Sequence, residues 1–184
     1  MNEKNYALFG LFGPVTAMIF ITAAIGLSPW FSWWNNALSD LGHSVTSEVA
    51  PLFNFGLLLT GFCIIVYSIT SFKNHAKYTS YALAFTGFAL QLVATFNEVY
   101  RPLHFQVSVL FFLSLCVSSV CYIQEKKSRL AIVALVISLL VWILYGIKIY
   151  SSGIAVPEAV SAIATASWVM LSAFRIYVNK TPES

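Results

Sequence analysis

The chain has 184 residues, of which 59% are hydrophobic and only 9% are charged, against roughly a quarter charged residues in an ordinary soluble domain. This composition excludes a water-soluble fold, because too few polar residues remain to cover the apolar surface. The formal net charge of +3 comes from basic residues scattered between apolar runs, a pattern typical of membrane topology signals and not of a nucleic-acid partner. We expect one domain over residues 1–184 and no nucleic-acid binding.

Six apolar runs, each about as long as one membrane crossing, predict six transmembrane helices. They cover residues 6–29, 49–72, 79–96, 103–123, 130–150 and 157–178. None shows the alternation of a barrel strand, and in lipid a backbone must satisfy its own hydrogen bonds. The predicted fold is therefore an all-α bundle of six transmembrane helices, with small residues such as Gly61 and Gly87 at helix contacts.

The lysines and arginines predict the orientation of this bundle. Eight lie before the first run, after the second or fourth, or near the end of the last: Lys4, Lys73, Lys77, Lys126, Lys127, Arg129, Arg175 and Lys180. Only Arg101 and Lys148 lie on the opposite side. Because cytoplasmic loops carry an excess of basic residues, we expect a multi-pass plasma-membrane protein with both termini in the cytoplasm.

The first connection, residues 30–43, is too long for a tight turn and rich in aromatic residues that suit a membrane interface. A short amphipathic helix in the headgroup layer, ending near Gly42, would place Asn36, Ser39, Asp40 and His43 along one polar face. Two interpretations remain open. This segment is an interfacial anchor with helix-capping polar residues, or it folds over the mouth of the bundle and contributes Asp40 to a site.

A second polar group surrounds the connection between the third and fourth runs. His104 and Ser108 are four residues apart and share one helix face. A histidine within a membrane helix is costly unless it has a partner. A hydrogen bond to Glu98 or Asp40 is the structural interpretation, and a metal-binding or acid–base role is the functional one. Arg101 is either a salt-bridge partner of these carboxylates or a ligand for a lipid phosphate.

The sixth run begins with Glu158, and hydroxyl residues follow it on the same side at Ser161, Thr165 and Ser172. Such a stripe is typical of helix packing through small hydroxyls. The candidate binding residues of the whole chain are Asn36, Asn54, Tyr100, Arg101 and Glu158.

Three motifs carry a family resemblance: the segments ALSDLG at 37–42, PLFNFG at 51–56 and RPLHFQVSVLFF at 101–112. At these segments the chain resembles Domain of Unknown Function 998, a family of small, mainly archaeal six-span membrane proteins. The resemblance covers roughly the first four helices and implies no activity. It implies that the characteristic polar positions are Ser39, Asp40, Asn54, His104 and Ser108.

More loosely, the chain is similar to seven-span intramembrane metal hydrolases such as alkaline ceramidases, which hold zinc with a serine, an aspartate and a histidine cluster. It departs from them in having six predicted spans, and in having Ser108 where a second histidine would follow His104. By this analogy a divalent metal such as zinc would be held by His104, His43 and a carboxylate, either Asp40 or Glu98.

These features support three hypotheses. The first is a lipid-modifying, hydrolase-like enzyme of the outer face, with candidate catalytic residues Asp40, His104, Ser39, Ser108 and Glu98. The second is a non-enzymatic lipid-binding protein or an accessory protein that docks a partner subunit. The third is a transporter, which is disfavoured because the inner halves of the helices lack ionisable residues for a relay. Membrane lipids are the expected partners in the first two.

Overall fold

The computed structural model describes residues 3–149 and 153–178, which form six long α-helices and no strand. The helices are α1 (Glu3–Gly26), α2 (Ala50–Tyr67), α3 (Lys77–Thr95), α4 (Leu103–Lys126), α5 (Arg129–Gly146) and α6 (Ala155–Val178). Three short helical segments join or extend them: η1 (Leu38–Gly42), η2 (Ser68–Phe72) and η3 (Glu98–Tyr100). All six predicted helices are present, and when η2 is counted with α2 their bounds lie within four residues of those expected. Residue 150 of the fifth predicted run and Lys180 lie outside the described residues.

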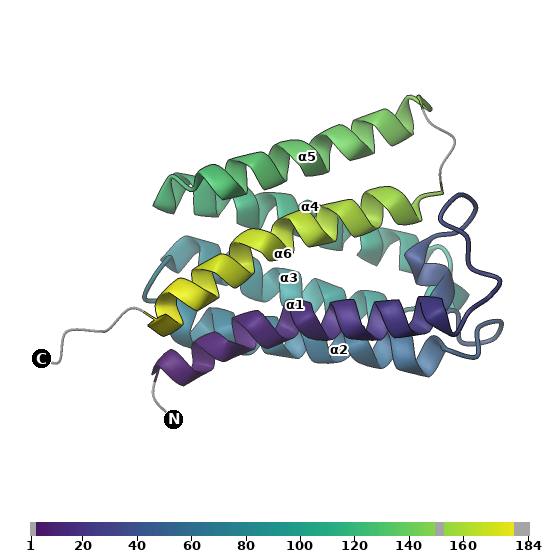
Figure 1. Cartoon of the computed structure of the whole chain (residues 1–184), viewed down its shortest axis with the longest axis horizontal. Coiled ribbons are helices and arrows are strands. Elements are labelled where there is room, and N and C mark those ends of the chain that lie inside the picture. The colour runs from purple at the N-terminus through teal and green to yellow at the C-terminus, as the bar shows by residue number, and fades with distance from the viewer. Residues whose placement is uncertain (1–2, 150–152, 179–184) are drawn as a thin grey trace, which may run out of the picture.

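The long helices lie side by side and form a ring, in which each helix packs against the next and α6 returns to α1 (Figure 1). We call the end that carries η1 and η3 the η1 end. The chain enters and leaves the bundle at the opposite end, which we call the terminal end. Direct contact between α4 and α6 is slight, so α4, α5 and α6 enclose space between them.

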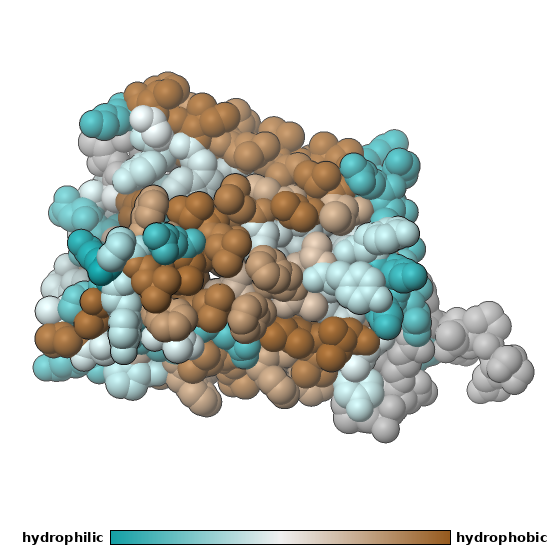
Figure 2. Space-filling model, turned by 180° about the vertical axis from the view of Figure 1, so that it is seen from behind, coloured by the Kyte–Doolittle hydropathy of each residue, from teal (hydrophilic) through white to brown (hydrophobic). Residues whose placement is uncertain are grey.

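Five of these helices are long and apolar enough to cross a membrane: α1, α2 with η2, α4, α5 and α6. Brown hydrophobic residues cover the middle of the molecule in Figure 2, and teal hydrophilic residues gather at its two ends. This distribution is that of a multi-pass membrane protein, whose lipid-facing surface is apolar. The remaining helix, α3, is more polar and lies between α2 and α4.

The core of the terminal end consists of large aromatic side chains joined by hydroxyl hydrogen bonds. Tyr122 stacks on Trp168 with ring centroids 4.6 Å apart, and the Trp168 indole N–H donates to Ser119 Oγ over 3.2 Å. Tyr67 shares a 2.9 Å hydrogen bond with Ser172. Ser172 therefore serves helix packing, as the hydroxyl stripe of the sixth run predicted.

Helices α2 and α3 approach closely at two glycines. A Cβ at Gly61 would lie 2.5 Å from the Gly87 carbonyl oxygen, and a Cβ at Gly87 would lie 2.8 Å from the Gly61 carbonyl oxygen. Both contacts are to backbone, which cannot rotate away. The two backbones touch because neither residue has a side chain.

We predict that Gly61→Ala lowers the thermal unfolding midpoint of the detergent-solubilised protein, because the new methyl group forces α2 and α3 apart at a cost of about 1–3 kcal/mol. Gly146→Ala is the matched control, since a Cβ there meets nothing within 4 Å. Equal midpoints for the two variants would contradict the close approach of α2 and α3.

Candidate functional site

The connection between α1 and α2 folds over the η1 end of the bundle. Its short helix η1 ends at Gly42, as expected, but it is a 3-10 helix whose Leu41 is 0% exposed. It therefore packs onto the bundle with its apolar side chains inward, and does not lie apart from it as an interfacial amphipathic helix. The Asn54 side chain in α2 holds the end of η1 by donating to the Gly42 carbonyl over 2.9 Å.

Two carboxylates from other elements hold η1 in this position. The Leu38 backbone N–H donates to Glu158 Oε2 at the start of α6 over 2.8 Å. The Ser39 hydroxyl donates to Glu98 Oε1 in η3 over 3.0 Å. Ser39, Glu98 and Glu158 were each candidates from the sequence, and the structure brings them to one end of the bundle.

The Asp40 side chain forms hydrogen bonds within its own turn. One carboxylate oxygen accepts hydrogen bonds from the Asn36 side chain over 2.9 Å and from the Ala37 N–H over 3.0 Å. This satisfies backbone and side-chain donors ahead of η1, as a helix cap does. Asn36, Ser39 and Asp40 therefore do not form the single polar face expected from the sequence. Ser39 bonds to Glu98, whereas Asn36 and Asp40 bond to each other.

His43 is also engaged locally, since its Nδ1 accepts from the backbone N–H groups of Val45 and Thr46 over 3.4 and 3.3 Å. Within residues 3–149 and 153–178, no three His, Cys, Asp or Glu side chains are grouped as metal ligands would be. The suggested ligand set of His104, His43 and Asp40 is not brought together, because both loop residues bond within their own turns.

His104 opens α4 and is held by a backbone group of α3. Its Nδ1 lies 2.7 Å from the carbonyl oxygen of Phe96, which is the C-cap of α3. A carbonyl only accepts hydrogen bonds, so Nδ1 carries the hydrogen and Nε2 of the neutral ring is left as an acceptor. The His104 side chain is thereby fixed in both orientation and tautomer, and it is only 5% exposed.

The free Nε2 of His104 faces a hydroxyl and a carboxylate. Ser108 Oγ, one turn along α4, lies 3.3 Å from it, and Glu98 Oε1 lies 3.7 Å from it. The sequence predicted the shared face of His104 and Ser108 and the proximity of Glu98. A serine hydroxyl next to the acceptor nitrogen of an oriented imidazole is the arrangement that activates a nucleophile.

Glu98 is the electrostatic centre of this group. Its second oxygen accepts from Arg101 Nε over 2.7 Å, an ion pair that the sequence predicted. Burial raises the pKa of Glu98, but the hydrogen bond from Arg101, the hydrogen bond from Ser39 and the charge of Arg101 act against burial, and the pKa lies below 4.5. Glu98 is thus held as a carboxylate beside His104.

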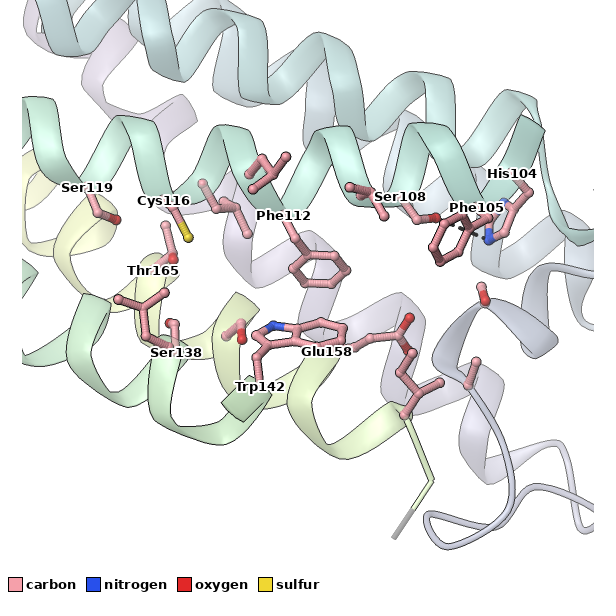
Figure 3. Close-up of a pocket in the computed structure, with 18 of the residues that line it drawn as sticks. His104, Phe105, Ser108, Phe112, Cys116, Ser119, Ser138, Trp142, Glu158 and Thr165 are labelled. Atoms are coloured by element: carbon pink, nitrogen blue, oxygen red, sulfur yellow. Dashed lines mark hydrogen bonds between the residues drawn. The ribbon is translucent and has the colours of Figure 1, made fainter. Parts of the chain in front are cut away.

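A cavity of about 710 Å³ extends from this group into the bundle between α4, α5 and α6 (Figure 3), within the range of about 300–1,000 Å³ for ligand sites. Its η1 end is lined by Ser39, Glu98, Arg101, His104, Ser108 and Glu158. Tyr100 lies outside it, half-exposed against Phe96.

Away from this polar end, the cavity wall is mostly apolar. Phe112 of α4 and Trp142 of α5 pack edge to face with ring centroids 5.1 Å apart (Figure 3). Cys116, Ser119, Ser138 and Thr165 lie at the far end. From His104 to Ser119 the wall follows α4 for about 22 Å at 1.5 Å per residue. Sequence reasoning missed Phe112 and Trp142, because it could not tell which helices are neighbours.

A family model described as a protein of unknown function, DUF998, matches residues 11–175. No curated protein matches the chain. No solved structure matches it.

The lowered pKa of Glu98 gives a pH-dependent prediction. The Glu98 carboxylate contributes stability that is fully present above pH 4.5 and is lost as pH falls below 4.5 through the lowered value. Glu98→Gln lacks this contribution, so its thermal unfolding midpoint should lie below that of the wild type at neutral pH and approach it in acid.

The measurement is a pH series of thermal unfolding midpoints in detergent for both proteins. Glu48→Gln, which removes an exposed carboxylate from the same η1 end, is the matched control. A difference between wild type and Glu98→Gln that stays constant down the series would contradict this role of the carboxylate.

Proposed function

The chain belongs to the DUF998 family of proteins of unknown function, and we propose that it is an integral membrane enzyme that cleaves an ester or amide bond of a lipid. One observation carries this proposal. The His104 and Ser108 pair lies at the polar end of a long cavity whose remaining wall is mostly apolar.

The shape of the cavity favours a lipid over a water-soluble ligand. Its apolar part runs along α4, which places it parallel to the acyl chains of a surrounding bilayer. The cavity is about 22 Å long, whereas the hydrocarbon of one leaflet is roughly 15 Å thick. The cavity is therefore long enough for the acyl chain of a membrane lipid. An amphiphile bound here places its chain against Phe112, Leu139 and Trp142, and its polar end next to Glu98, His104 and Glu158.

The reaction proceeds by acyl transfer through Ser108. Ser108 Oγ attacks the carbonyl carbon of the lipid, and its proton passes to His104 Nε2. As the carbon–oxygen or carbon–nitrogen bond breaks, His104 returns that proton to the departing alcohol or amine. Water then attacks the acyl group on Ser108 and gives a proton to His104. That proton passes back to Ser108 as the fatty acid leaves.

Three neighbouring groups support this pair. The Phe96 carbonyl holds the His104 ring through Nδ1. Glu98, 3.7 Å from Nε2, stabilises the imidazolium that forms during the reaction. Ser39 and Arg101 position Glu98. Asp40, a catalytic candidate from the sequence, is in this proposal a positioning residue that shapes the η1 turn.

A non-enzymatic lipid-binding or accessory protein is the second candidate. The observation that favours it is the cavity itself, since its long, mostly apolar wall suits the binding of a lipid chain whether or not the lipid is cleaved. The two candidates differ in whether the bound lipid is cleaved.

We predict that Ser108→Ala lowers lipid hydrolysis by about 10²–10⁴-fold while leaving the thermal midpoint within a degree or two, because Ser108 lines a cavity and its hydroxyl bonds to His104 of the same helix. The assay uses purified protein in nanodiscs and fluorogenic acyl esters and amides. A fluorophosphonate carrying an alkyl chain should modify Ser108, as located by peptide mass spectrometry.

Ser114→Ala is the matched control on the same helix, since its hydroxyl bonds to the Phe111 carbonyl and does not line this cavity. His104→Ala should abolish both hydrolysis and fluorophosphonate labelling. Lipid binding without any Ser108-dependent hydrolysis or labelling would overturn the enzyme and favour the binding protein.

We also propose that the chain crosses the plasma membrane six times and that both of its termini lie in the cytoplasm. The eight-to-two division of basic residues supports this orientation. The 19 residues of α3 extend for about 28 Å, close to the thickness of the hydrocarbon core. The active end then faces outward.

This orientation predicts the labelling of two single-cysteine variants, made in a background without Cys63, Cys116 and Cys121. In intact cells a membrane-impermeant maleimide should label Asn35→Cys, in the connection between α1 and α2. It should label Asn74→Cys, in the connection between η2 and α3, only after lysis. Both positions are exposed asparagines in connections. The reverse pattern would contradict the orientation, and labelling of both in intact cells would contradict the number of crossings between them.

A further inference from the structure

The first turns of α6 present two polar side chains to the cavity that the proposed reaction does not use. Glu158 and Ser161 are three residues apart on one helix face, and both line the cavity wall. Figure 3 shows Glu158 extending from α6 into the space beneath α4.

Glu158 is an acidic side chain without a basic partner. One of its oxygens accepts from the Leu38 N–H, but within the described part of the chain the basic side chains that contact an acid are Arg101 and His104, and both contact Glu98. Arg101 is therefore already engaged, and Lys148, the other basic residue of this end, is exposed beyond α5. An acid in an apolar wall keeps its negative charge only when a cation pairs with it.

Ser161 has a buried hydroxyl without a partner. Other buried helix hydroxyls bond back to a carbonyl in the preceding turn, as Thr60, Ser68 and Ser138 do. Ser161 is only 3% exposed, yet its Oγ makes no hydrogen bond to any residue in the described ranges. Among the described residues Ser28, which follows the end of α1, is the other such residue, and it does not line this cavity. The sequence analysis interpreted Ser161 as a packing hydroxyl, and helix packing does not explain why this buried hydroxyl lacks a hydrogen-bond partner among the described residues.

We propose that Glu158 and Ser161 form a recognition subsite for a cationic amine, so that the lipid substrate carries an ammonium group near its scissile bond. This inference rests on the proposed lipid site and names its substrate class. The ammonium supplies the positive charge that Glu158 lacks and donates to the Ser161 hydroxyl oxygen. An anionic headgroup is disfavoured, because it meets Glu158 and Glu98 at the same end of the cavity.

The test measures binding of single-chain amphiphiles to the full chain in phosphatidylcholine nanodiscs. Three probes have equal brominated chains and differ only in a primary ammonium, a hydroxyl or a sulfate head. Bromine in the chain quenches the fluorescence of Trp142, which lines the cavity. Trp142→Phe should remove the quenching that reports cavity binding.

We expect the ammonium probe to bind about tenfold more tightly than the hydroxyl probe, and the sulfate probe to bind least tightly. Glu158→Gln should remove this preference while leaving the hydroxyl probe unaffected, since glutamine keeps an acceptor for the Leu38 N–H. Ser161→Ala should weaken the ammonium probe alone. Glu48→Gln, which removes an exposed carboxylate of the η1 end, should change nothing.

The outcomes separate this inference from the proposed function. Equal binding of the ammonium and hydroxyl probes, or an ammonium preference that persists in Glu158→Gln with an unchanged thermal midpoint, would overturn the amine subsite and leave the lipid cavity standing. No Trp142-dependent quenching by any probe would overturn the lipid cavity and the subsite together.

Discussion

The site depends on two carboxylates that hold the α1–α2 connection against the bundle. Glu98 accepts from Ser39, and Glu158 accepts from the Leu38 backbone. Without them, the donors of η1 would face a mostly apolar cavity, where an unpaired polar group is costly. Because the two acids come from η3 and the start of α6, they join three segments far apart in sequence. They also close one end of the cavity and give it polarity.

The same constraint explains why the cavity is asymmetric. At the η1 end, charges and hydrogen bonds from several elements converge on His104 and Ser108. Farther along α4, the wall is formed by apolar side chains such as Phe112 and Trp142, whose rings pack edge to face with centroids 5.1 Å apart. A chain-like apolar molecule with one polar end matches both regions at once, whereas a small polar substrate would leave the apolar part empty. A lipid bound in this way has its polar end next to His104 and Ser108, the residues that carry the proposed hydrolysis.

Much of the fold followed from apolar run length, because a lipid-exposed backbone must be helical and a helix of fixed rise must span a fixed thickness. The i, i+4 spacing likewise predicted that His104 and Ser108 meet. The partner of His104 was not predictable, because the Phe96 carbonyl is a backbone group freed by the end of α3. The local hydrogen bond between Asp40 and Asn36 agrees with the helix-capping interpretation of the first connection, but residue spacing alone could not decide between capping and a place for Asp40 in the site. Sequence alone also leaves open which helices enclose a cavity.

The central claim, that the cavity between α4, α5 and α6 holds a lipid chain, is tested most directly by photo-crosslinking in membranes. A lipid with a diazirine midway along its acyl chain would be activated by light, and the modified residues located by peptide mass spectrometry. The account predicts modification concentrated at cavity residues of α4 and α5, such as Phe112 and Leu139, and loss of that modification in the presence of excess unlabelled lipid. Modification spread over membrane-facing residues such as Phe55 and Ile69, with no competition at Phe112, would contradict it.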